Sequence, residues 1–156
     1  MKRLLARNVN LNSVIADKVG VAATRAARRT GLLDHDRLEP GEALWIVPSR
    51  GVHTFGMKFP IDVMALDERG VVIDCVPNMK PWRIRLPRRG TAGVLELAAG
   101  RVAASGTEIG HRILFEATDA ADYADSADRR HTKKGDSPLF SQQKETADVF
   151  DSGEVA

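Results

Sequence analysis

Runs of apolar residues divide the middle of the chain into predicted β-strands. Residues 43–47 are a short apolar run that follows the turn at Pro40-Gly41, residues 94–97 give another short strand, and residues 61–66 are apolar at every position except Asp62. A run that is apolar at successive positions is typical of a strand buried on both faces. Residues 71–76 resume the pattern after Asp67-Glu68-Arg69-Gly70, which favours a tight turn because glycine adopts a positive φ readily. We therefore predict a β-hairpin over residues 61–76.

Shorter elements are predicted on both sides of this hairpin. Residues 4–6 and 13–16 flank an asparagine-rich turn and predict two short strands, and residues 112–115 predict a closing strand. Residues 21–30 are rich in Ala and Arg and precede Gly31, so they predict a helix that ends at a glycine. Residues 101–105, between two glycines, predict another helical turn. The pattern indicates a mainly β fold, a small antiparallel β-sandwich or barrel with one N-terminal helix and one short helix.

Large apolar side chains become sparse after residue 116, and the charge changes sign there. Residues 1–116 hold 18 Lys and Arg against 12 Asp and Glu, whereas residues 117–156 hold 5 against 9. A segment with so little apolar surface cannot offset the entropy of ordering it. We expect one compact β-rich domain over residues 1–116 and an acidic, disordered C-terminal tail over residues 117–156.

The remaining composition narrows the class of protein. One cysteine, Cys75, allows no disulfide within the chain, and no apolar run approaches the roughly 20 residues that span a bilayer. The four histidines lack metal-ligand spacing, and no glycine-rich phosphate-binding loop occurs. The sequence therefore predicts a soluble cytoplasmic protein with no membrane association, no bound metal and no dinucleotide or other cofactor.

Candidate chemistry concentrates in residues 50–62, which connect two predicted strands. Loops on a rigid scaffold commonly carry binding residues, so we expect a small-ligand pocket here. Its candidate residues are His53, Thr54, Met57, Lys58 and Asp62. In an alternative, a hydrolase or transferase, His53 is a general base oriented by Asp62. The sequence offers no clear nucleophile for such a reaction, because Ser49 and Thr54 qualify by residue type only and Cys75 lies within an apolar strand.

A second alternative rests on a basic cluster beside a tryptophan. Arg83 and Arg85 alternate with Trp82, Ile84 and Leu86, and two more arginines, Arg88 and Arg89, follow. Arg83, Arg85, Arg88 and Arg89 could hold a nucleic acid or another anionic partner. Because strand residues alternate between faces, the alternation predicts one apolar face and one cationic face.

Several blocks of the sequence resemble a known family. Val52-His53-Thr54-Phe55-Gly56-Met57-Lys58-Phe59-Pro60-Ile61-Asp62-Val63 resembles the signature of the domain-of-unknown-function 192 family of small prokaryotic proteins. Three further blocks of the chain resemble the blocks that flank this signature in the family, and they occur in the same order. They are Gly31-Leu32-Leu33, Pro40-Gly41-Glu42-Ala43-Leu44 and Leu95-Glu96-Leu97-Ala98-Ala99-Gly100. The resemblance covers about residues 12–116 and implies a compact, mostly β domain. Because the family is uncharacterised, it implies no reaction.

Overall fold

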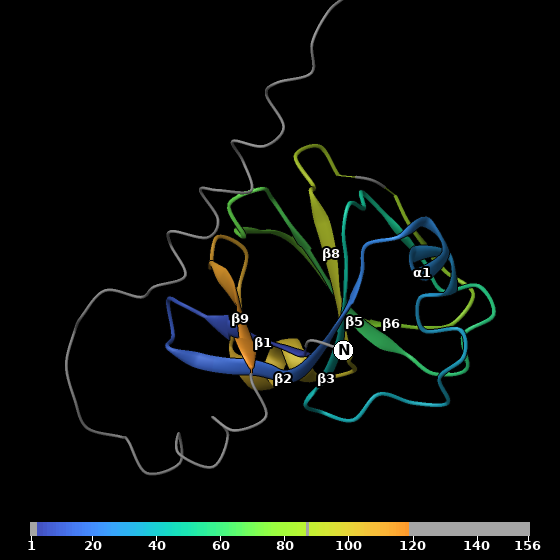
Figure 1. The fold of residues 1–156 in the computed structure, drawn as a ribbon, viewed down its shortest axis with the longest axis horizontal. Helices are drawn as coiled ribbons and strands as arrows, with labels where there is room; N and C mark the ends of the chain where they lie inside the picture. The colour runs from blue at the N-terminus through green and yellow to red at the C-terminus, as the bar shows by residue number, and fades with distance from the viewer. Residues whose placement is uncertain (1–2, 87, 119–156) are drawn as a thin grey trace, which may run out of the picture. The chain divides into compact units, whose positions relative to one another are not determined.

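A curled seven-stranded sheet dominates the computed structural model, which describes residues 3–86 and 88–118 (Figure 1). Its strands run in the order β6-β5-β8-β3-β2-β1-β9. They are β1 (Arg3–Asn8), β2 (Ser13–Ala22), β3 (Glu42–Ile46), β5 (Ile61–Leu66), β6 (Val72–Met79), β8 (Gly93–Ala98) and β9 (Ile113–Thr118). A separate pair joins β4 (Val52–His53) to β7 (Ile84–Arg85), and two short helices are α1 (Arg25–Thr30) and α2 (Arg101–Ser105). The predicted mainly β fold with two short helices is confirmed.

The sheet is mixed, whereas the sequence predicted an antiparallel one. Within the seven-stranded sheet, only β2 and β3 pair in parallel, with Val21 opposite Trp45. Parallel neighbours need a long connection, and residues 23–41 supply it, with α1 as part of the crossover. The sheet also curls until its two edge strands meet at a bridge between Val71 and Arg112. It is therefore a barrel that closes at this point.

The N-terminal helix is shorter than predicted. Residues 21 and 22 belong to β2, and the helix begins only at Arg25, after Thr24, whose hydroxyl accepts a hydrogen bond from the Ala27 amide at 3.1 Å. Pairing with β3 overrides the local helix preference of these residues. The predicted glycine end is confirmed, because the Gly31 amide donates to the Ala27 carbonyl at 2.9 Å.

The predicted hairpin is confirmed. All six residues of β5 are buried, and β5 pairs antiparallel with β6 through the turn at residues 67–70. Gly70 has φ of +78°, and its amide donates to the Asp67 carbonyl at 3.0 Å. A carboxylate oxygen of Asp67 accepts from the amides of Arg69 and Val71, so the turn is held by its own first residue.

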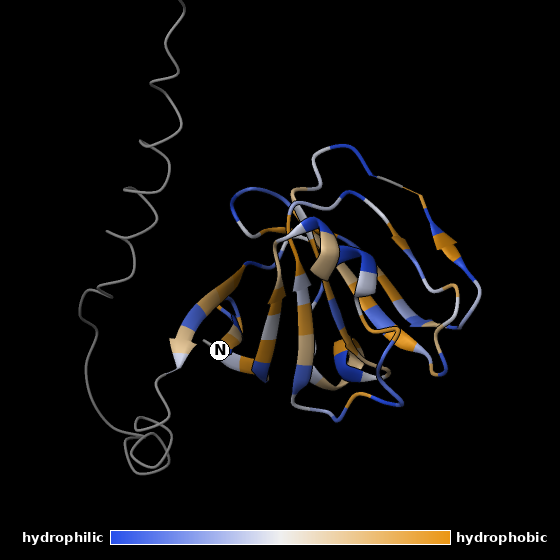
Figure 2. Cartoon of the chain, turned by 45° about the vertical axis from the view of Figure 1, so that its right-hand side comes forward, coloured by the Kyte–Doolittle hydropathy of each residue, from blue (hydrophilic) through white to orange (hydrophobic). Residues whose placement is uncertain are grey.

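Two apolar cores lie on opposite faces of the central strands. The first is inside the barrel and includes Ile15, Met64, Leu66, Leu95 and Leu97. Trp45 and Phe115 pack beside it with ring centroids 4.8 Å apart. Gly93 is required under Trp45, because a Cβ there would stand 2.4 Å from the indole ring. Several strands of the sheet carry both apolar and polar residues (Figure 2), whereas β5 is apolar at every position except Asp62.

The second core covers the outer face of β5 and β8, on the side where α1 is seen in Figure 1. Its buried members are Leu32, Val52, Met57, Ile61, Val63, Met79 and Val94. Three of them, Leu32, Val52 and Met57, come from outside the seven-stranded sheet, and residues 50–62 supply two of these three. The connections of the chain therefore help to build this outer face, which also holds the candidate site.

The last strand extends beyond the predicted domain limit of residue 116. Ala117 and Thr118 pair with Leu4 and Arg3 of β1. These partners allow residues 117 and 118 to continue the strand although apolar patterning has ended. The remainder of the predicted tail lies outside the described residues. Among the helices of the described ranges, none is long and apolar enough to cross a membrane.

Candidate functional site

The segment that carries most of the predicted site residues runs along the outer face of the barrel. His53 lies in β4, directly opposite Ile84 of β7, and is exposed. Its imidazole stacks on Phe55, with ring centroids 5.4 Å apart, and Phe55 in turn packs against Trp82 at 6.0 Å. Met57 is buried in the outer core. Of the five predicted residues, His53 and Met57 line a common cavity.

Asp62 is fully buried and is occupied by backbone amides. Its carboxylate accepts hydrogen bonds from Asn78 at 2.8 Å, Gly100 at 3.1 Å and Val102 at 2.8 Å. Val102 lies in the first turn of α2, so this carboxylate fixes the start of that helix. No hydrogen bond joins Asp62 to His53 among the described residues. The acid–base pair of the hydrolase hypothesis is therefore not assembled here.

Thr54 is also buried and holds the neighbouring loop. Its hydroxyl donates to the Lys80 carbonyl at 2.7 Å and accepts from the Arg83 amide at 2.9 Å. The Trp82 amide donates to the Thr54 carbonyl at 3.0 Å. Trp82 has φ of +63°, a value that is rare for a bulky side chain and persists only where the surroundings enforce it. These hydrogen bonds to Thr54 enforce it.

Lys58 makes an exposed ion pair with Asp36, with 2.5 Å between Nζ and a carboxylate oxygen. The hydrogen bond and the charge of Asp36 raise the pKa of the Lys58 ammonium, and those of Lys58 lower the pKa of the Asp36 carboxyl. Both groups are solvated, so the pair contributes little to stability. It links the segment at residue 58 to the loop that follows α1.

The cavity beside His53 lies between the end of α1, β4 and β8 and has a volume of about 170 Å³. Its buried lining residues are Leu32, Ile46, Val52, Met57 and Glu96, and we call these the floor. Its exposed lining residues include Arg29, Thr30, Pro48 and His53, and we call these the mouth. Arg28, half-buried, lies next to the mouth. The mouth is cationic and the floor is apolar except for one carboxyl group.

That carboxyl group belongs to Glu96, which is 4% exposed. On β8 it stands opposite Leu44 of β3 and Val63 of β5, so its neighbours across the sheet are apolar. Its Oε2 atom is buried and has no hydrogen-bond partner among the described residues. Burial raises the pKa of the Glu96 carboxyl to about 7. The floor of the cavity thus presents a carboxyl group with an oxygen atom that the described residues leave without a hydrogen bond.

Comparison with known proteins places the chain in a family. Residues 7–115 match the DUF192 family, which is described as Uncharacterized ACR. The chain belongs to this family. It is 34% identical over 80 residues to a UPF0127 protein of Pyrococcus abyssi (strain GE5 / Orsay), covering 47% of this chain and 68% of that protein. It is 30% identical over 117 residues to a UPF0127 protein of Thermococcus sibiricus (strain DSM 12597 / MM 739), covering 70% of this chain and 73% of that protein.

Solved structures share the DUF192 fold described above. A putative transcription regulator from Sinorhizobium meliloti 1021 superimposes with a TM-score of 0.63 at 21% identity, covering 73% of this chain and 92% of that one. A protein of unknown function from Novosphingobium aromaticivorans DSM 12444 gives a TM-score of 0.62 at 21% identity, covering 72% and 83%. At this identity the likeness concerns the fold alone.

In this DUF192 protein, sequence reasoning missed Glu96, although a signal was present. Glu96 is the one acidic residue in the apolar run of residues 93–98, as Asp62 is in the run of residues 61–66. Each is therefore an acidic residue within a strand that is otherwise apolar. Only the tertiary structure separates them, because Asp62 meets three backbone amides and Glu96 meets apolar side chains.

The four arginines of the nucleic-acid hypothesis do not share one environment. Arg85 forms an ion pair with the buried Asp74, and Arg88 lies 3.8 Å from the same carboxylate. Arg83 and Arg89 are exposed. The apolar side chains of this stretch also face solvent instead of the core. Trp82, Ile84 and Leu86 are 65%, 59% and 70% exposed. The need to neutralise Asp74 places Arg85 on the inner side and leaves the apolar residues outside.

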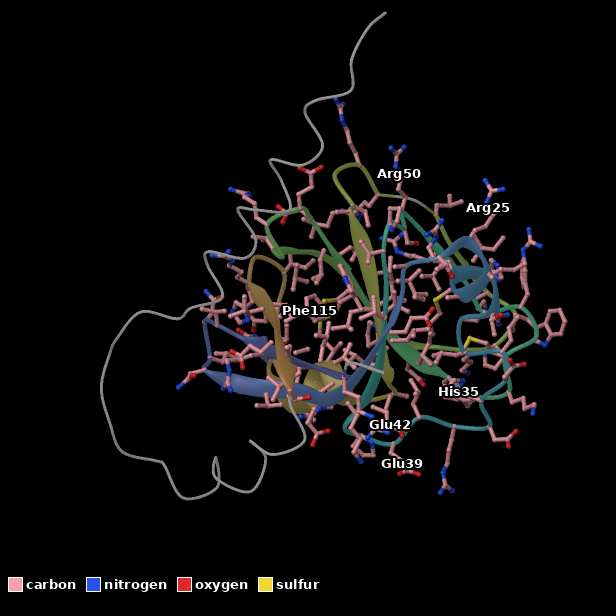
Figure 3. The ribbon with its side chains drawn as sticks, in the orientation of Figure 1. Arg25, His35, Glu39, Glu42, Arg50 and Phe115 are labelled. Atoms are coloured by element: carbon pink, nitrogen blue, oxygen red, sulfur yellow. The ribbon has the colours of Figure 1, made fainter. Side chains whose placement is uncertain are left out.

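A larger surface cleft, of about 690 Å³, lies near the hairpin turn. Its charged lining residues are Arg50, Asp67, Glu68, Arg69, Arg88 and Arg89, and all except Asp67 are exposed. Solvated side chains of both signs need no ligand to be satisfied, so the smaller cavity is the stronger candidate. Arg50 lies toward one end of the molecule, and His35, Glu39 and Glu42 lie toward the other (Figure 3). Within the described ranges, no three His, Cys, Asp or Glu residues are grouped to hold a metal ion.

Proposed function

We propose that this protein is a small-molecule binding module whose ligand occupies the cavity between α1, β4 and β8. One observation carries the proposal: the Glu96 carboxyl group is buried at the cavity, and its Oε2 has no hydrogen-bond partner in the part of the chain that the structure describes. Burying a polar group without a hydrogen bond is unfavourable, and burying an unpaired charge is more so. A ligand that donates a hydrogen bond to Glu96 would remove this unfavourable contribution.

The form of the cavity supports a small ligand. Binding sites combine apolar walls with a few polar groups that fix orientation, and Glu96 stands alone in that role on the floor. The volume of about 170 Å³ is close to the ~150 Å³ of an engineered cavity that holds benzene. The ligand is therefore a compact molecule with a donor group at one end.

The residues predicted from the sequence take separate parts in this proposal. His53 and Met57 line the cavity. Thr54 and Asp62 position the loops around it through their backbone hydrogen bonds. Lys58 joins the same segment to the loop after α1 through Asp36. The ligand contacts that we propose thus come from His53, Met57 and Glu96.

A thermal-shift screen tests the proposal, because a ligand that binds only the folded state raises its melting temperature. The library would hold small amines, alcohols, amides and carboxylates, each tested on the wild type and on Glu96→Leu. The leucine removes every acceptor and suits the apolar neighbours, so the variant should fold. Glu116→Gln is the matched control, since Glu116 lies on β9 and pairs with Arg7 away from the cavity.

We expect at least one compound to stabilise the wild type and Glu116→Gln but not Glu96→Leu. Equal stabilisation of Glu96→Leu would show that the compound binds elsewhere and would contradict the proposal. A library without any stabilising compound at millimolar concentration would count against it as well.

A further inference from the structure

The arrangement of charge around the cavity narrows the class of ligand. At the floor, Glu96 lies between Leu44 and Val63 on neighbouring strands, and no cationic side chain forms an ion pair with it among the described residues. A neutral donor would satisfy one oxygen. An ammonium group would in addition balance the charge of the carboxylate, and hydrogen bonds between charged groups are about twice as strong as neutral ones.

The mouth carries the opposite charge. Arg28 and Arg29 occupy the last turn of α1 and line the cavity. One guanidinium nitrogen of Arg28 donates to the Ala23 carbonyl, and neither arginine forms an ion pair with an acidic residue in the described ranges. Two guanidinium groups without acidic partners suit a carboxylate, which a guanidinium can bind through two parallel hydrogen bonds.

Apart from Glu96, the floor is apolar. Leu32, Ile46, Val52 and Met57 are all buried and offer no side-chain hydrogen bonds beyond the weak acceptor sulfur of Met57. A volume near that of a benzene-sized cavity leaves room for only a few carbon atoms between the two polar ends of a ligand. The cavity therefore suits a ligand with a cationic donor group at one end, a short apolar chain in the middle and an anionic group at the other end.

We propose that the ligand is a short ω-amino carboxylate, bound with its ammonium group on Glu96, its methylene chain along Leu32, Val52 and Met57, and its carboxylate at Arg28 and Arg29. This inference rests on the proposed binding function and names its ligand class. An α-amino acid fits less well, because its two charged groups share one carbon atom and cannot reach the floor and the mouth together.

Calorimetric titration with a matched set of probes tests the class. The probes are 5-aminopentanoate, pentylamine, pentanoate and 5-hydroxypentanoate, which differ only in their end groups. We expect 5-aminopentanoate to bind the wild type at least about tenfold more tightly than each of the other three, as loss of a charge-assisted hydrogen bond predicts.

Two variants test which residue binds each end of the ligand. Glu96→Gln keeps the shape and removes the charge, so it should weaken 5-aminopentanoate at least about tenfold and leave 5-hydroxypentanoate within about threefold. Arg29→Gln should reduce the affinity for 5-aminopentanoate toward that for pentylamine. Arg25→Gln is its matched control, because Arg25 is an exposed residue of the same helix, lies at the outer edge of the molecule (Figure 3) and does not line the cavity.

The outcomes separate this inference from the proposed function. If 5-hydroxypentanoate binds as tightly as 5-aminopentanoate, or if Arg29→Gln and Arg25→Gln behave alike, the ω-amino carboxylate class is wrong. If none of the four probes binds but a library compound still distinguishes the wild type from Glu96→Leu, the class is wrong and the binding function stands. If no compound makes that distinction, both proposals fail.

Discussion

The carboxylate of Asp62 accepts a hydrogen bond from the backbone amide of Val102 at 2.8 Å, and thereby joins the first residues of β5 to the start of α2. The same carboxylate accepts from the amides of Asn78 and Gly100. Asn78 lies in β6, and Gly100 and Val102 lie at the start of α2, so donors from two separate parts of the chain converge on one buried group. The carboxylate thus supplies the acceptor that these buried amides need.

Asp62→Asn should lower the free energy of unfolding by about 1–3 kcal/mol, because the amide group of asparagine turns a donor toward a backbone donor. Urea denaturation measures the change. Asp36→Asn is the control, since Asp36 is exposed and its solvated ion pair contributes little to stability. Equal effects of the two substitutions would show that the three amides are not dependent on the charge of Asp62.

Thr54→Val should lower the free energy of unfolding by about 1–3 kcal/mol, because it leaves the Arg83 amide and the Lys80 carbonyl without the hydroxyl that both use. Thr54→Ser keeps the hydroxyl and should lose less. Urea denaturation of both variants tests this. If serine is as damaging as valine, the methyl group rather than the hydroxyl stabilises the loop.

Gly70→Ala should be more destabilising than Gly100→Ala by at least about 1 kcal/mol, since tight packing adds to conformational strain. Both glycines have a positive φ, +78° and +87°, so both substitutions introduce similar backbone strain. A Cβ at Gly70 would stand 2.5 Å from the Ile113 carbonyl oxygen, whereas nothing lies within 4 Å of one at Gly100. Thermal denaturation of the pair measures the difference, and equal losses would mean that the strand shifts to make room.

Glu96 should make the protein less stable as the pH rises. Its pKa in the folded state is raised to about 7, above the ordinary 4.5, so the folded state holds a proton that the unfolded state releases between these values. The stabilising contribution is complete below about pH 4.5 and is lost as the pH passes 7, with a total on the order of 3 kcal/mol.

Urea denaturation between pH 5 and 8 checks this for the wild type, Glu96→Gln and His53→Gln. Glu96→Gln should flatten the dependence and exceed the wild type in stability at pH 8. His53 lines the same cavity, and His53→Gln serves as the control for a substitution at this place. An unchanged slope in Glu96→Gln would contradict the assignment of the pH dependence to Glu96.

Much of the sheet could be predicted from local pattern. Apolar runs located β3, β5, β6 and β8, and the glycine at residue 70 located the turn. The parallel pairing of β2 with β3 could not be predicted, because it depends on a contact between residues more than twenty positions apart. The same contact shortened α1, since residues 21 and 22 gain a partner strand that outweighs their weak helix preference.

The candidate site was only partly predictable, for a related reason. The sequence marks Asp62 and Glu96 equally, as acids within apolar strands. Which of them is satisfied depends on amides from residues 78, 100 and 102, which the fold delivers to Asp62 alone. Likewise, the alternation of residues 82–86 defines two faces but not which one turns inward. Asp74, in another strand, decides this by pairing with Arg85.

The junction where the edges formed by β6 and β9 meet is the weakest contact between neighbouring strands of the barrel. Three backbone hydrogen bonds cross it, from Val72 to His111, from Gly110 to Val72 and from Ile113 to Gly70, each at 2.8 Å. Every other neighbouring pair of strands in the sheet shares a longer ladder, so the first partial opening of the domain should occur here. The cavity lies on a different part of the wall, beside α1, β4 and β8. A family member could therefore lose this closure, and with it some rigidity, while keeping the residues that line the cavity in place.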